Sequence, residues 1–182
     1  MSFLPTNIGS QFLNFSVVSS FKTRTMGMDV SKLYPNFSDC EIISLQNAWK
    51  IIEPKIRRLS KEIPVDLYVT NCELIENFRD QNGTISRYDL INYTYRLLRV
   101  YGKVIKCNVE PLQTSKILEP FVKLHTKYST DIANIRLQLD YIQRHIFSEL
   151  SSHLSPTTVD SFDKLTKFML HYFRIRAGSL VD

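Results

Sequence analysis

The chain has 182 residues and a formal net charge of +5, and it is 43% hydrophobic, 12% aromatic and 23% charged. This length suits one domain with a buried core, and this composition excludes a disordered or fibrous chain. The basic residues are scattered in ones and twos and do not alternate with aromatic residues, so they predict a solvated surface and no nucleic-acid partner.

The amino-terminal stretch and the cysteines bear on location. We expect residues 1–37 to form a flexible extension; its first 28 residues contain Lys22 and Arg24 but no acid, and a transit peptide or a membrane-contacting segment is the alternative. No run of residues approaches the roughly 18–20 apolar residues of a membrane span. The three cysteines lie more than thirty residues apart, which predicts reduced thiols and a cytoplasmic protein.

The first half of the chain predicts two helices. Ser38 and Glu41 have the spacing of a capping box, and apolar residues recur at helical spacing from Ile42 to Ile56, with Pro54 near the end. A second helix is expected around 61–72, with Ile63, Leu67 and Tyr68 facing inward. A turn follows at residues 81–83, where Gln, Asn and Gly are adjacent.

The second half predicts four more helices and therefore an all-α protein. A long helix is expected from Ser86 to about Cys107, and a shorter one begins near Thr114. Two long helices follow, at about 131–153 and after the N-cap pair Ser155 and Pro156. The long helix places one apolar face at Leu90, Thr94, Leu97, Tyr101, Val104 and Ile105, and the shorter helix places one at Leu118, Phe121, Val122 and His125.

Three anchor residues in this order give the chain a resemblance to the globin family, in particular to divergent invertebrate and nematode-type globins. Trp49 matches the tryptophan of the first helix, Phe78 follows twenty-nine residues later, and His125 matches the proximal histidine. The stretch from Arg99 to Gly102 is similar to the fifth helix of globins. The resemblance covers residues 38–177, leaves 178–182 as a tail, and implies a globin fold, a three-over-three helical sandwich.

The resemblance also implies a haem b site. His125 would be the axial ligand of the iron, and Phe121, four positions earlier, would share its helical face. Phe78 would pack on the haem, Leu97 would cover the iron, and Tyr93 takes the place where globins usually carry a distal histidine or glutamine. The alternatives are that His125 is an ordinary core or surface histidine and that Phe78 and Leu97 are ordinary packing residues. For Tyr93 the alternative is that it points outward while Asn92, Thr94 or no polar group faces the haem. His145, His153 and His171 are expected to be surface or interhelical groups.

The resemblance implies a protein that binds oxygen or another diatomic gas, in sensing or in redox chemistry with a partner, more than in bulk oxygen storage or transport. A second hypothesis is a globin-fold regulatory module without haem, which Pro64 in the expected distal wall favours. A third is nitric oxide dioxygenation or peroxidase-like turnover, which requires a separate reducing partner. The oligomeric state stays open.

Overall fold

The computed structural model describes residues 34–71, 79–80, 83–84, 87–127 and 132–178, and the described side chains lie within 34–71, 88–123 and 134–176. Its elements are α1 (Asp39–Ile52), η2 (Glu53–Lys55), α2 (Ile56–Thr70), β1 (Arg79–Asp80), β2 (Gly83–Thr84), α4 (Arg87–Lys106), α5 (Pro111–Lys127), α6 (Ile132–Glu149) and α7 (Pro156–Gly178). The fold is all-α, apart from the antiparallel pair of β1 and β2, in which Arg79 pairs with Thr84.

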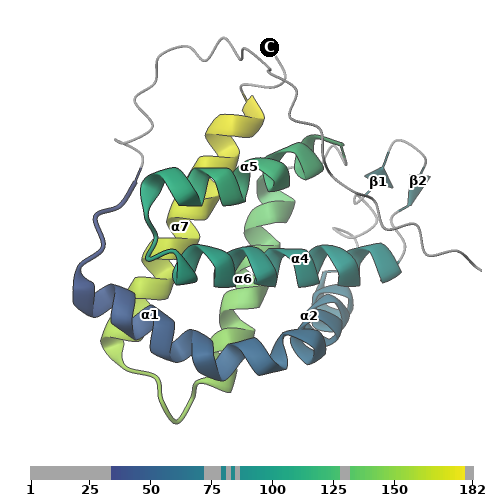
Figure 1. The fold of residues 1–182 in the computed structure, drawn as a ribbon. Coiled ribbons are helices and arrows are strands. Elements are labelled where there is room, and N and C mark those ends of the chain that lie inside the picture. Colours follow the sequence, from purple (N-terminus) through teal and green to yellow (C-terminus); the bar gives the residue numbers. More distant parts are fainter. Residues whose placement is uncertain (1–33, 72–78, 81–82, 85–86, 128–131, 179–182) are drawn as a thin grey trace, which may run out of the picture.

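The helices pack as crossing pairs (Figure 1). α2 packs most extensively on α4, α1 and α6 both pack on α7, and α5 packs on α4 and α7. In Figure 1, α6 and α7 cross behind α4 and α5. One continuous core of apolar residues joins all six α-helices. No helix in the described part of the chain is both long and apolar enough to cross a membrane.

The predicted start of α1 is confirmed. The Ser38 hydroxyl accepts from the Glu41 amide, and the Ser38 amide donates to the Glu41 carboxylate at 2.7 Å. At α7 the Thr158 amide donates to the Ser155 hydroxyl at 3.1 Å, and Pro156 is the first residue of the helix, as the sequence predicts. These side chains satisfy backbone N–H groups that have no partner within their own helix.

Two predicted helix starts are wrong. α2 begins at Ile56 and not near Lys61, because Pro54 stands in the single turn η2 and the chain continues as helix directly after it. α5 begins at Pro111 and not near Thr114, because Glu110 caps it: its carboxylate accepts from the amides of residues 112 and 113.

One predicted inward residue of α2 is also wrong. Leu67 and Ile63 are 1% exposed, whereas Tyr68 is 58% exposed. Successive helical residues are about 100° apart, so Tyr68 turns toward solvent when Leu67 faces the core. The predicted apolar face of α4 is confirmed, since all six of its residues are buried. The start of that helix at Ser86 lies outside the described residues.

α1 and α4 approach each other closely at Gly102. Trp49 is 2% exposed, and a Cβ atom built on Gly102 would come within 2.5 Å of its Nε1 atom. Only glycine fits this approach. The contact fixes which side of α4 faces α1.

Gly102→Ala is expected to lower the free energy of unfolding by about 1–3 kcal/mol, because the new methyl group collides with the indole of Trp49 and overpacks the core. Urea unfolding measures this. In the background of Trp49→Phe, which supplies a smaller ring, the same substitution should cost clearly less. An equal cost in both backgrounds would contradict the assigned contact.

Residues just before α1 also belong to the packed structure. The Lys164 ammonium group on α7 donates to the Asn36 carbonyl at 2.6 Å and to the Glu41 carboxylate at 2.9 Å, and it lies over the Phe37 ring at 4.6 Å. The Tyr34 ring contacts the Phe168 ring of α7 at 4.8 Å. Hydrogen bonds from Lys164 and then from the Ser38 amide lower the pKa of Glu41 from 4.5 to about 2.

Glu41→Gln tests whether the ion pair of Glu41 with Lys164 holds α1 on α7, through the pH dependence of the stability. Because the folded-state pKa of Glu41 is depressed, its ionised form stabilises the fold above the ordinary pKa of 4.5, and this contribution is lost as the pH falls toward about 2. The variant should therefore unfold more easily than the parent protein at pH 7, and the gap should narrow below pH 4.5. The exposed Asp160→Asn serves as control. A difference in stability between the variant and the parent protein that does not change with pH would contradict this role of the Glu41 carboxylate.

Candidate functional site

α4 supplies the first wall of the candidate site. Leu97 is 0% and Tyr93 is 9% exposed, so both side chains lie in the core. The neighbouring Thr94 is buried too, but its hydroxyl donates to the Leu90 carbonyl at 2.9 Å within the same helix. Asn92 is half-buried. The structure thus turns Tyr93 inward, which answers one of the alternatives left open by the sequence.

α5 supplies the second wall. Leu118, Phe121 and Val122 are buried at 0%, 4% and 1% exposure, so the predicted apolar face of this helix is confirmed for these three residues. His125 belongs to the same helix, one turn after Phe121. The side chain of His125 lies outside the described part of the structure, and so does the whole of Phe78.

The two walls touch. The Tyr93 ring of α4 and the Phe121 ring of α5 lie with their centroids 5.2 Å apart and are tilted by 44°. Phe121 also contacts Phe173 of α7 at 5.6 Å. Residues from three helices therefore form one aromatic cluster. The sequence predicts Tyr93 and Phe121 as site residues, whereas it predicts Phe173 only as an apolar position of the last helix.

An ion pair holds the outer side of α5 on α7. Glu119 accepts from the Arg176 guanidinium at 2.9 Å and from the Tyr172 hydroxyl at 3.3 Å. Burial, and then the nearby Glu119 carboxylate, raise the pKa of Tyr172. The ion pair therefore holds α5 on α7, while Phe121 holds α5 on α4 through its contact with Tyr93.

The corner between α4 and α5 is strained. Asn108 and Val109 have φ values of 57° and 54°, a conformation that is costly for a β-branched residue such as valine. Their amides donate to the Ile105 and Val104 carbonyls at 3.1 and 3.0 Å, the pattern of a Schellman motif at a helix end. Gln46 of α1 donates to the Asn108 side chain at 2.6 Å. The corner thus fixes the path from α4 into α5.

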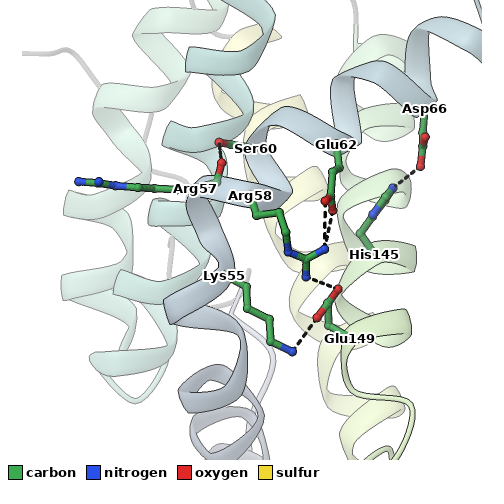
Figure 2. Close-up of polar contacts among 8 residues, drawn as sticks. All are labelled: Lys55, Arg57, Arg58, Ser60, Glu62, Asp66, His145 and Glu149. Carbon is green, nitrogen blue, oxygen red and sulfur yellow. Dashed lines mark hydrogen bonds and ion pairs between the residues drawn. The ribbon is translucent and has the colours of Figure 1, made fainter.

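Polar residues line the contact between α2 and α6 (Figure 2). Glu149 of α6 accepts from Lys55 at 2.6 Å and from Arg58 at 2.5 Å, and these two bonds lower its pKa. One turn earlier on α6, the His145 Nε2 atom lies 2.8 Å from the Asp66 carboxylate. His145 is therefore interhelical, as predicted, and His153 and His171 are exposed.

Haem can be tested against these residues. Haem iron is commonly held by an imidazole in an apolar pocket. Leu97, Leu118 and Phe121 are buried apolar residues, and His125 lies one helical turn after Phe121 in the same helix. A flat ring between two side chains needs about 7 Å, since nonbonded carbon atoms stay about 3.5 Å apart on each side. The 5.2 Å between the Tyr93 and Phe121 rings is shorter. The described positions of Tyr93 and Phe121 therefore leave no room for a porphyrin between them.

No protein-family model matches the chain, and no curated protein matches it either. Within the described ranges, no group of three or more His, Cys, Asp and Glu residues is placed to hold a metal ion.

Phe121→Leu is expected to destabilise the haem-free protein by about 1–2 kcal/mol, because two ring contacts between helices are lost. Urea unfolding followed by circular dichroism measures the change. Phe147→Leu, at a half-buried ring with one contact to Phe162, is the matched control and should cost less. A Phe121 variant as stable as the parent would show that these rings do not hold α4 and α5 together.

Proposed function

We propose that this chain is a haem-binding globin that binds a diatomic gas. The observation that supports this most is the meeting of Tyr93 and Phe121, two residues assigned to the haem site from the sequence, across the contact between α4 and α5. The close packing of Trp49 on Gly102 also favours the globin alignment, because both residues take part in it.

In this proposal His125 would hold the haem iron from α5, and Phe121, one turn earlier, would line the same pocket. Leu97 would line it from α4, and Phe78 would pack on the porphyrin. The phenol of Tyr93 would be the hydrogen-bond donor for the gas, which is worth about 0.5–1.5 kcal/mol for an ordinary bond of this kind. The haem supplies the iron that binds the gas. The helices would form the three-over-three sandwich of the family.

The gas is dioxygen or another diatomic molecule, and the role is sensing or redox chemistry with a partner protein in the cytoplasm. The contact between the Tyr93 and Phe121 rings, which lies between α4 and α5, suits such a role better than bulk storage of gas. The Tyr93 and Phe121 rings, 5.2 Å apart, must separate before a porphyrin enters. The chain's own residues would therefore control when haem is taken up.

A second candidate is a globin-fold interaction module without haem. The distance between the two rings favours it, since 5.2 Å leaves no room for a porphyrin between Tyr93 and Phe121. Pro64, buried within α2, also stands where the alignment expects a distal-pocket leucine. The two candidates differ in one property, which is the capacity to hold iron porphyrin.

Protein produced with haem available should be coloured, with a Soret band that shifts on reduction and again on addition of carbon monoxide. His125→Ala should lose the band, because the iron loses its donor on α5. Absorption spectra in the ferric, ferrous and carbonmonoxy states measure this.

His171→Ala is the matched control, because His171 is exposed on α7 and its loss should leave the spectrum unchanged. If the parent protein stays colourless after reconstitution with haem, the module without haem is the better account. If the His125 variant keeps the parent spectrum, another residue holds the iron.

A further inference from the structure

One side of α4 carries a row of basic residues. They recur every three or four positions, which is the spacing of one helical face, and all are exposed: Arg96, Arg99, Lys103 and Lys106. The one acid of α4, Asp89, lies in the first turn of the helix, seven positions before Arg96. The outer side of α4 is therefore basic along the rest of its length.

A second basic row lies on the helical stretch that α1, η2 and α2 form without interruption. Lys50, Arg57 and Lys61 are exposed, and they follow one another at seven and four positions, which is about two turns and one turn. Figure 2 shows Arg57 turned away from the ion pair of Arg58 with Glu149. Arg57 thus belongs to the outer side of α2 and not to its contact with α6.

Two polar contacts join the second row to the end of α4. The Gln46 side chain donates to Asn108, two residues after α4, at 2.6 Å, and the Lys106 ammonium group pairs with Glu53 at 2.5 Å. Lys50 lies between Gln46 and Glu53 at helical spacing, so it faces the same side of the molecule. The two rows therefore lie next to each other and form one surface, here called the basic face: Lys50, Arg57, Lys61, Arg96, Arg99 and Lys103.

Neighbouring acids do not neutralise the basic face. None of its six side chains forms an ion pair within the described residues. On α7, by contrast, the exposed Lys167 pairs with Asp163 one turn away. Like charges on adjacent turns of a helix repel each other, so a surface of this kind is stabilised by an anionic partner.

Exposed apolar side chains lie at the ends of both rows. Ile43, three positions before Gln46, is 55% exposed, and Tyr88, about three turns before Arg99, is 71% exposed. A membrane surface matches this combination, because lipid phosphates attract basic residues and the headgroup layer accepts tyrosine and aliphatic side chains. Single-stranded nucleic acid would instead favour aromatic rings placed among the basic residues for stacking on bases.

We infer that the basic face binds the surface of a membrane that contains anionic lipids. Its basic side chains contact the lipid phosphates, and Ile43 and Tyr88 enter the headgroup layer. Binding of this kind needs no helix that crosses the membrane. It also needs no haem, and it is therefore a property separate from the proposed binding of a gas.

Sedimentation of the full chain with lipid vesicles tests this binding. Vesicles of phosphatidylcholine and phosphatidylserine in equal parts should bind the protein, and vesicles of phosphatidylcholine alone should not. Added salt should release the protein, because it screens the charges. Arg99→Gln combined with Lys103→Gln should weaken binding to the anionic vesicles about thirtyfold, since each basic residue near such a surface contributes about a factor of five.

Lys167→Gln combined with Arg174→Gln is the matched control, because it removes one lysine and one arginine from exposed positions of α7, which crosses behind α4 in Figure 1. The control should bind anionic vesicles like the parent protein. Both double variants change exposed residues and should keep the parent's melting temperature. Ile43→Gln should also weaken vesicle binding, since an apolar contact with the headgroup layer is lost.

Three results would overturn the inference. A parent protein that does not sediment with the anionic vesicles would exclude a membrane partner. An equal loss of binding in the two double variants would mean that the net charge of the chain, and not the basic face, controls binding. A parent protein that binds duplex DNA or RNA but no vesicle would assign the basic face to a nucleic acid.

Discussion

The close approach of α1 to α4 is the constraint on which the arrangement of the candidate site depends. Gly102 faces the Trp49 ring so closely that no side chain fits between them. Tyr93 lies nine residues earlier on α4, which at about 100° per residue places it on the opposite side of the helix. With Gly102 turned to α1, Tyr93 must turn away from it, and its ring meets Phe121 of α5.

The second determinant is the spacing between α4 and α5. The strained corner at Asn108 and Val109 sets where α5 leaves α4. The ion pair between Glu119 and Arg176 holds α5 on α7, and the contact of the Tyr93 and Phe121 rings holds α5 on α4. Each contact is modest alone, and the ring pair adds about 0.5–1.5 kcal/mol beyond the area it buries. A gap held by contacts of this size can open when a large apolar ligand replaces them, which connects the packing to the proposed uptake of haem.

Much of the fold follows from local sequence signals. The capping box at Ser38 and the apolar face of α4 depend on residues three or four positions apart, so the sequence alone predicts them. The starts of α2 and α5 are harder to predict, because a proline can either end a helix or begin one. Pro54 forms one tight turn between two helices, and Pro111 opens a helix that Glu110 caps.

The candidate site is less predictable, because it depends on contacts between distant helices. Tyr93 faces inward because Trp49 fixes which side of α4 faces α1. Phe121 reaches Tyr93 because the corner at Asn108 and Val109 sets the direction of α5. The contact of Phe173 with Phe121 is not predictable, since an aromatic residue at helical spacing does not reveal what it meets across the core. The roles of Phe78 and His125 remain predictions from the sequence.

We propose that His125 holds a haem iron between α4 and α5. A crystal structure of the protein grown with haem, with anomalous data collected at the iron edge, is the sharpest test. We expect an iron peak at bonding distance from the His125 imidazole, with the Tyr93 and Phe121 rings moved apart. A structure without iron, in which those rings keep their 5.2 Å contact, would contradict it.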